Sequence, residues 1–169
     1  MNTPKTTQAG PAVVLRPHLK NSDLPAIRTL VEETGMFSYA EIEIAAELVG
    51  EFLKQGAISG YRFAVAESEG DVIGYACFGP TPCTVSSYDL YWIAVHPSQQ
   101  HRGIGKQLLE DAERRIAESG GTRVYADTSG RDAYVPTRAF YERMGYIRVA
   151  VLPDFYAPGD AKVIYAKSL

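Results

Sequence analysis

The spacing of hydrophobic and polar residues changes along the chain, and each spacing predicts one kind of element. Apolar residues that recur every three or four positions predict amphipathic helices, whereas alternation or short continuous apolar runs predict strands. Helical spacing predicts helices over residues 24–34, 42–55, 104–119 and 136–144. The other two patterns predict strands over residues 13–16, 61–67, 72–78, 88–95, 124–127, 147–151 and 161–167. Helices and strands therefore mix along one chain, which predicts an α/β fold.

Glycine, proline and short polar residues mark the boundaries between these segments. Ser22 and Asp23 offer an N-cap for the first helix, and residues 69–71 (EGD) predict a hairpin turn between two strands. Residues 153–159 predict the turn between the last two strands. Residues 1–11 are polar, contain proline and have nothing to bury. We therefore expect a disordered N-terminal tail, followed by one domain over residues 12–169.

Composition narrows the choice of partners and location. The chain has 169 residues, of which 46% are apolar, enough for one domain with a full core. A net charge of -3 provides no general basic surface, so we expect no nucleic-acid partner; the charge suits a cationic acceptor slightly better. No stretch approaches the roughly 18 consecutive apolar residues of a membrane span, and the N-terminus lacks an apolar signal core. We therefore expect a cytoplasmic protein that does not bind membranes.

The cysteines and histidines do not form a metal-ligand pattern. Cys77 falls within an expected strand and Cys83 within a proline-containing loop, with no CxxC pair or companion ligands nearby. His18, His96 and His101 also lack the spacing of metal ligands. We expect structural thiols and no metal.

Residues 91–109 (YWIAVHPSQQHRGIGKQLL) join a buried strand, a glycine-containing turn and the start of a helix. Gly103 and Gly105 lie at the helix entrance, where the first backbone N–H groups have no intrahelical partner and the helix dipole is positive. Glycine leaves the approach open, so a phosphate could bind there. A dinucleotide-binding turn with Asp127 downstream is a weaker alternative, because Leu108 occupies its third glycine position and the loop is too long. A purely structural helix start is the other alternative.

Two motifs resemble signatures of the GCN5-related N-acetyltransferase (GNAT) family. Gln100-x-x-Gly103-x-Gly105 resembles the family's acyl-CoA pyrophosphate loop, and residues 139–146 (AFYERMGY) stand where the family has its second signature. The order of elements fits this family from about residue 13 to residue 167. The resemblance implies a single-domain α/β fold of the GNAT-type acyl-CoA N-acyltransferases. In that fold, a mixed, mostly antiparallel sheet of about seven strands is flanked by four helices.

The resemblance also implies acetyl-CoA as the acyl donor and suggests where it binds. The pyrophosphate would bind the glycine loop, which gives as contacts Gln100, Arg102, Gly103, Ile104, Gly105 and Lys106. The pantetheine arm would lie in a splay between the fourth and fifth strands, along the backbone of Ile93, Ala94 and Val95. The family usually has asparagine seven residues before its signature tyrosine. Here that position is Tyr134, and Ser129 or Thr128 could take over the contact to the cofactor arm.

Acetyl transfer to an amine needs two proton transfers, because the ammonium must lose a proton before attack and the departing thiolate must gain one. Tyr141 matches the family tyrosine that faces the thioester sulfur and is the candidate acid; core packing is its alternative role. Asp89 resembles the strand glutamate of the histone-type branch and is the candidate base, acting through a water relay. By alternation Asp89 would share a face with Tyr91 and Ile93. A turn-capping role for Asp89, or Tyr91 in its place, remains an alternative.

Aromatic residues in two connections predict the wall of the acceptor pocket. By the family pattern and by residue type, the candidates are Phe37, Tyr39, Tyr91, Phe155 and Tyr156. Phe155 and Tyr156 could provide a stacking surface for a cationic amine. A turn with one packed aromatic residue and no substrate is the alternative.

Taken together, the motifs predict an N-acetyltransferase that transfers acetyl from acetyl-CoA to a primary amine of a small molecule or a protein, by direct attack in a ternary complex. A non-catalytic acyl-CoA-binding sensor is the alternative function, and use of a longer acyl-CoA stays open. Exposed edge strands near the C-terminal end could pair between protomers, so a homodimer is possible.

Overall fold

The computed structural model describes residues 12–169, so the predicted tail over residues 1–11 lies outside the described residues. The strands are β1 (Val14–Arg16), β2 (Arg62–Ser68), β3 (Asp71–Pro80), β4 (Ser87–Val95), β5 (Arg123–Ser129), β6 (Ile147–Ala157) and β7 (Asp160–Ser168). The helices are α1 (Asp23–Glu33), α2 (Tyr39–Gln55), α3 (Ile104–Glu118) and α4 (Val135–Arg143), with short 3-10 turns η1 (Gly56–Ser59), η2 (Pro97–Gln99) and η3 (Asp132–Tyr134). Every helix and strand predicted from the sequence is present, in the predicted order.

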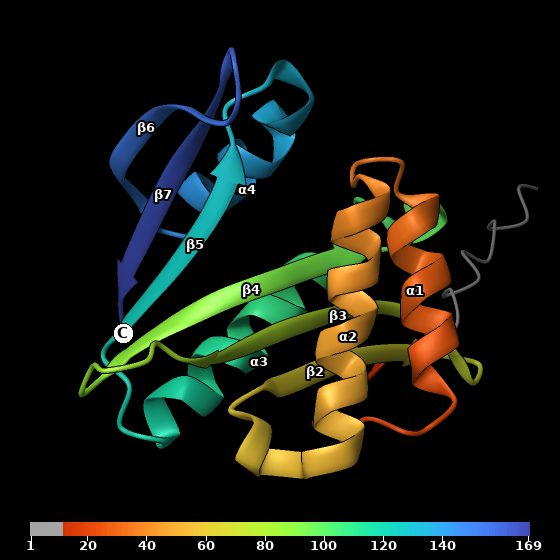
Figure 1. The fold of residues 1–169 in the computed structure, drawn as a ribbon. Helices are drawn as coiled ribbons and strands as arrows, with labels where there is room; N and C mark the ends of the chain where they lie inside the picture. Colours follow the sequence, from red (N-terminus) through yellow and green to blue (C-terminus); the bar gives the residue numbers. More distant parts are fainter. Residues whose placement is uncertain (1–11) are drawn as a thin grey trace, which may run out of the picture.

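The strands form one sheet in the order β1-β2-β3-β4-β5-β7-β6. Among the strands of residues 12–169, only β4 and β5 are parallel neighbours, and the other neighbours are antiparallel. This confirms the predicted mixed sheet of seven strands with four helices. α1 and α2 cover one face of β2–β4 and α3 lies on the opposite face, whereas α4 lies beside β5 and β7 (Figure 1). Within residues 12–169, no helix combines the length and apolarity that crossing a membrane requires.

Two apolar cores lie on the two faces of the sheet. Leu108 of α3 belongs to the core that contains Ala64, whereas Val49 of α2 belongs to the core that contains Phe63. Because neighbouring residues of β2 are buried on opposite faces, the strand reads as a continuous apolar run rather than an alternating one. The two cores fix β4 in the centre of the sheet, where the site is formed.

β4 and β5 diverge along their length (Figure 1). They pair only where Ser87–Leu90 face Arg123–Ala126, at the start of both strands. Beyond that point, the edge of β4 that faces β5 has no paired strand among the described residues. The expected splay between the fourth and fifth strands is therefore present.

A β-bulge in β4 lies at the point where this divergence begins. Cys77 and Phe78 of β3 pair with Trp92 and Leu90, so Tyr91 is an extra residue without an opposite partner. The bulge shifts the alternation of side chains by one position. Consequently, Leu90 packs in the same core as Ile93. Asp89, next to Leu90, points to the opposite face from Ile93, so the prediction that these two residues share a face is wrong.

The ends of two elements also differ from prediction. β6 continues to Ala157 through most of the segment predicted as a turn, and pairing with β7 resumes at Ala157 and Asp160 after a register shift. Asp154 makes this possible because it adopts a left-handed φ of 54° and its Oδ1 accepts a hydrogen bond from the Gly159 N–H at 2.6 Å. The turn is thus limited to Pro158 and Gly159.

The predicted N-cap of α1 is not formed by a side chain. Ser22 makes no capping hydrogen bond. The carboxylate of Asp23 instead accepts from the Lys20 backbone N–H at 2.6 Å and pairs with Arg16 at 2.6 Å. Because Asp23 is buried, a cation is needed to compensate its lost hydration. The charge of Asp23 therefore fastens α1 to β1.

Candidate active site

A cavity of about 610 Å³ opens where β4 and β5 diverge, and we call it the inner cavity. Nine of the predicted site residues line it: Phe37, Tyr91, Ile93, Ala94, Val95, Gln100, Tyr134, Tyr141 and Tyr156. These residues come from the α1–α2 connection, β4, the loop after it, η3, α4 and β6. The splay thus brings together residues that lie far apart in the sequence.

A second cavity of about 550 Å³ lies at the N-terminus of α3, and we call it the loop cavity. Its lining includes the predicted loop residues Gln100, Gly103, Ile104, Gly105 and Lys106, together with Phe140, Arg143 and Met144 of α4. The two cavities share Ile93, Ala94, Val95, Gln100 and Thr137 as lining residues. They therefore meet along the C-terminal end of β4.

The glycine loop has the geometry expected of an anion site. Gly103 precedes the first residue of α3 with a left-handed φ of 79°, and a Cβ at this position would meet no atom within 4 Å. At Gly105 the space is only large enough for ordinary contact, with Phe140 3.7 Å from a hypothetical Cβ. Gln100 donates from Nε2 to the Val95 carbonyl at 3.1 Å, which fixes the loop to the end of β4.

The charged residues of the loop differ in their placement. Lys106 lines the loop cavity and lies 3.7 Å from a carboxylate oxygen of Glu110. Arg102 lines neither cavity, and its guanidinium donates to the side chain of Gln99. Sequence reasoning missed Arg143, which α4 brings to the loop cavity. Its position in the AFYERMGY motif, two residues after Tyr141, gave no sign of this proximity.

Tyr141 lies at the inner cavity with a nearly buried side chain. Its ring is held between Tyr146 and Tyr165, with centroid separations of 5.5 and 5.7 Å. Burial raises the pKa of the phenol, and the nearby Asp127 carboxylate raises it further. The hydroxyl therefore stays protonated at neutral pH, as a proton donor must.

Two carboxylates lie near each other at the start of the splay. Asp127 of β5 lines the inner cavity and forms an ion pair with Lys162. Asp89 lines neither cavity, and its pKa is raised by burial and, to a smaller extent, by the Asp127 carboxylate. Sequence reasoning considered Asp127 only for a dinucleotide site, although its place at the end of a buried strand pointed to the edge of the sheet. Of these two carboxylates, Asp127 is therefore the one at the cavity wall.

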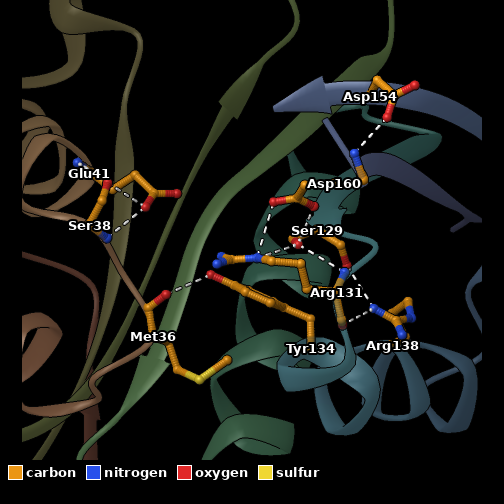
Figure 2. Close-up of polar contacts among 10 residues, drawn as sticks. Met36, Ser38, Glu41, Ser129, Arg131, Tyr134, Arg138, Asp154 and Asp160 are labelled. Atoms are coloured by element: carbon orange, nitrogen blue, oxygen red, sulfur yellow. Dashed lines mark hydrogen bonds and ion pairs between the residues drawn. The ribbon is translucent and has the colours of Figure 1, made fainter. Parts of the chain in front are cut away.

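Tyr134 crosses the opening of the splay (Figure 2). Its hydroxyl donates to the Met36 carbonyl at 2.9 Å, and the Arg131 guanidinium lies 5.4 Å from its ring centroid. The Ser129 hydroxyl donates a hydrogen bond to the Asp160 carboxylate at 2.6 Å. The same carboxylate forms an ion pair with the Arg131 guanidinium at 3.1 Å. The hydroxyls of Tyr134 and Ser129 are therefore already engaged.

Thr128 is different from its engaged neighbours. Thr128 lines the inner cavity and is only 5% exposed. Its hydroxyl has no hydrogen-bond partner among the described residues. An unpaired buried hydroxyl is costly, which makes it available to a bound ligand.

Aromatic side chains form another part of the wall of the inner cavity. Phe37 packs on Trp92 with a centroid separation of 4.8 Å, and Tyr91 and Tyr156 line the same cavity. Burial raises the pKa of both Tyr91 and Tyr156 to about 12. Trp92 was missed by sequence reasoning, since within β4 it reads only as core. It faces the cavity because the splay leaves that edge open.

Two predicted wall residues do not line the inner cavity. Tyr39 is 72% exposed at the start of α2. Phe155 lies beside the cavity, where its ring contacts Tyr156 and carries the Lys162 ammonium 4.8 Å from its centroid. Phe155 thus supports Tyr156 and Lys162 rather than the cavity surface.

Histidine and cysteine contribute no clustered ligands within residues 12–169, where no group of three or more His, Cys, Asp or Glu side chains could hold a metal. His96 instead contacts Glu33 through Nε2 at 2.6 Å and Ser98 through Nδ1 at 2.8 Å. Cys77 is buried and Cys83 is exposed, and both are free thiols.

Comparison with known proteins agrees with this geometry. A family model described as an acetyltransferase (GNAT) domain matches residues 59–148. A crystal structure from Desulfovibrio desulfuricans, of a chain assigned to the GNAT acetyltransferases, has a TM-score of 0.91 and 46% identity, covering 93% of this chain and 99% of that one. The alanine N-acetyltransferase of ribosomal protein bS18 from Escherichia coli (strain K12) is 22% identical, over 85% of this chain and 88% of its own length.

Other curated relatives are longer than this chain. Mycothiol acetyltransferase of Amycolatopsis mediterranei is 36% identical over 51% of this chain. The chain spans 26% of that protein and 13% of a second relative that is 32% identical to it. On the strength of the matched domain and the shared fold, the chain belongs to the GNAT acetyltransferase family.

Proposed function

We propose that this protein transfers the acetyl group of acetyl-CoA to a primary amine by direct attack in a ternary complex. One observation carries the proposal: the loop cavity and the inner cavity meet along Ile93–Val95 of β4, with Tyr141 on the wall. A donor that enters through one cavity and an acceptor that enters through the other can meet only there. Both substrates can therefore be bound at once, which direct attack requires.

Acetyl-CoA would occupy the loop cavity and reach the inner cavity with its thioester end. Its pyrophosphate would accept hydrogen bonds from the N–H groups at residues 103–106, where the dipole of α3 favours negative charge. Lys106 and Arg143 supply additional positive charge at this cavity. The pantetheine amides would pair with the free edge of β4, as an added strand does. The Thr128 hydroxyl is the further partner for the arm, since Tyr134 and Ser129 are engaged elsewhere.

The chemical step needs a deprotonated amine and a protonated leaving group. The amine nitrogen attacks the thioester carbonyl, a C–N bond forms, and the C–S bond breaks as the tetrahedral intermediate collapses. Tyr141 would donate its phenolic proton to the departing sulfur, as its place at the cavity allows. Asp127 would accept the ammonium proton through water. Asp89, which is more distant from the cavity, would act on Asp127 rather than on the substrate.

The acceptor is a cationic amine with an apolar body. Three carboxylates line the inner cavity, those of Glu41, Asp127 and Asp160. Among the lining side chains only Arg131 carries a positive charge. Carboxylates attract an ammonium group, and the aromatic wall of Trp92, Phe37 and Tyr156 provides rings for its apolar part. The E. coli relative named above acts, by its name, on an amine, the alanine of ribosomal protein bS18.

Calorimetry with acetyl-CoA and free CoA, followed by thiol release with a panel of amines and short peptides, tests the proposal. Saturable binding of acetyl-CoA and release of thiol with at least one acceptor is the expected result. Binding of acetyl-CoA without release from any member of the panel would favour the sensor function. If neither acetyl-CoA nor free CoA bound, the assignment of the loop cavity as the CoA site would be overturned.

A further inference from the structure

Lys162 of β7 is the cation that pairs with the candidate base Asp127, through Oδ2 of that carboxylate. Ile164 lies opposite Asp127 in the antiparallel pairing of β5 with β7, so Lys162, two residues before Ile164, points to the same face of the sheet. The other carboxylate oxygen, Oδ1, forms no hydrogen bond among residues 12–169. Asp127 lines the inner cavity, whereas Lys162 lines neither cavity. The lysine therefore holds one oxygen of the carboxylate and leaves the other free.

The side chain of Lys162 is held by more than its ion pair. Its ammonium lies 4.8 Å from the ring centroid of Phe155 in β6, and that ring packs edge-on against Tyr156 at a centroid separation of 5.1 Å. Only 20% of the lysine side chain is exposed. An aromatic face attracts an ammonium group, and a mostly buried side chain has few other places to go. Lys162 thus differs from an exposed surface lysine, whose ion pairs contribute little.

The negative charge of Asp127 acts on groups of three neighbouring elements. Burial raises the pKa of Asp89 in β4, of Tyr141 in α4 and of Tyr156 in β6, and the Asp127 carboxylate raises each of them further. The ammonium of Lys162 has the opposite effect on Asp89 and lowers its pKa. Two neighbouring carboxylates repel each other, and an ammonium beside both favours their charged forms. One lysine therefore compensates the charge of two carboxylates.

We propose that Lys162 is a positioning residue for acetyl transfer, which holds Asp127 by Oδ2 so that Oδ1 accepts the proton of the acceptor. This inference rests on the proposed function, in which Asp127 is the base. The proton passes from the acceptor ammonium through one water to Oδ1, and the lone pair that remains on the nitrogen attacks the thioester carbonyl. Because Lys162 lines neither cavity, it acts through Asp127 and not on a substrate.

Steady-state kinetics of two Lys162 variants test the proposal, with the panel amine that releases thiol fastest as acceptor. Lys162→Met removes the charge and keeps the length of the side chain. Its kcat/KM for the amine should fall about tenfold or more, the cost of a misplaced catalytic group, while the KM for acetyl-CoA stays constant. Lys162→Arg keeps a cation of similar reach and should retain most of the activity. A methionine variant as active as the wild type, or an arginine variant as slow as the methionine variant, would overturn the proposal.

Lys167 provides a matched control on the same strand. Its ammonium pairs with Glu113 at 2.6 Å and lies 5.6 Å from the ring centroid of Tyr146, and 24% of its side chain is exposed. Glu113 lines neither cavity. Lys167→Met therefore loses the same two kinds of contact without affecting the base, and its turnover should stay near that of the wild type. Equal losses of turnover in Lys162→Met and Lys167→Met would indicate a general effect on the fold and contradict a positioning role.

NMR of isotope-labelled aspartate carboxyl groups gives a readout without turnover. The signal of Asp89, assigned with the Asp89→Asn variant, should titrate at a higher pH in Lys162→Met than in the wild type, because the ammonium of Lys162 lowers the pKa of Asp89. Lys167→Met should leave this titration unchanged. The same titration in Lys162→Met as in the wild type would mean that the ammonium does not act on the two carboxylates, and the proposal would fail. Since the titration needs neither CoA nor an acceptor, the role of Lys162 and the acetyl transfer can fail separately.

Discussion

The Tyr134 hydroxyl donates a hydrogen bond of 2.9 Å to the Met36 carbonyl, joining residues that are 98 positions apart in the sequence. Met36 belongs to the connection between α1 and α2, and Tyr134 stands at the start of α4 (Figure 2). The contact thus links two parts of the molecule on opposite sides of the splay between β4 and β5. In the GNAT family this position usually holds asparagine. In this chain it holds Tyr134, whose hydrogen bond to Met36 ties the two sides of the cavity together.

Tyr134→Phe removes this tie and leaves the aromatic ring in place. We expect the free energy of unfolding to fall by about 0.5–1.5 kcal/mol, the net worth of one hydrogen bond. Tyr156→Phe is the matched control, because no hydrogen bond contributes to the raised pKa of its phenol. Urea denaturation measures both variants. Equal stability of the wild-type and Tyr134→Phe proteins would mean that the hydroxyl is as well hydrated in the folded state as in the unfolded chain.

Tyr141→Phe tests the proton donor. Turnover should fall about 10²-fold or more, since general acid catalysis is worth about 10²–10⁴. The affinity for acetyl-CoA should change little, because the ring remains packed between Tyr146 and Tyr165. Tyr146→Phe serves as control: Tyr146 lines neither cavity, so turnover should persist. Rapid turnover in Tyr141→Phe would remove Tyr141 from the mechanism.

Gly103→Val tests the anion site. Valine is strained at a φ of 79°, so a control with equal strain is needed, and Gly120 provides it with a φ of 83° and open space around its Cβ. Both substitutions should cost about 1–3 kcal/mol of stability. Only Gly103→Val should raise the dissociation constant of CoA, measured by calorimetry, because only Gly103 lines the loop cavity. Equal CoA affinity in the two variants would contradict the phosphate assignment.

Asp127→Asn and Asp89→Asn distinguish the two candidate bases. The first should lower kcat/KM for the amine about 10²-fold while the KM for acetyl-CoA stays constant, since Asp127 lines the inner cavity. The second should have a much smaller effect, because Asp89 lines neither cavity. Steady-state kinetics against both substrates provide the comparison. The reverse ranking of the two variants would restore Asp89 as the base.

Stability should decline in alkaline solution. Tyrosine ionises near pH 10 in an unfolded chain, whereas burial raises the pKa of Tyr91 and Tyr156 to about 12 in the folded protein. Between these values the folded state binds more protons than the unfolded one, so the free energy of unfolding decreases as pH rises. The stabilisation is complete below pH 10 and lost through about pH 12. Urea denaturation across this range measures the slope, which Tyr91→Phe should reduce; an unchanged slope would contradict the shift.

Most of the fold was accessible from the sequence because apolar spacing reports local geometry directly. The helix over 104–119 and the strand over 88–95 were predicted within one or two residues of α3 and β4. The glycine loop was also legible, since a helix N-terminus preceded by glycine has the same physical properties in any context. Errors arose where a single local irregularity decided the outcome, as with the left-handed backbone of Asp154 that lets β6 continue to Ala157.

The site was predicted only in part, for a related reason. Alternation along β4 gave the wrong face for Asp89, because the bulge at Tyr91 inserts one residue and a shift of one position moves every preceding side chain to the other face. Trp92, Asp127 and Arg143 were missed as cavity residues because each is ordinary within its own segment. Their proximity depends on how β4 diverges from β5 and how α4 packs beside α3.

By itself the sequence determined the order of elements, the anion-binding helix start and the family to which its motifs point, because each depends on residues close together along the chain. The tertiary structure decided which side chains share a cavity, which hydroxyls are already engaged and which strand is left at the edge. Those properties depend on contacts between distant segments, and a single residue such as the extra Tyr91 of β4 can redirect them without altering the local pattern.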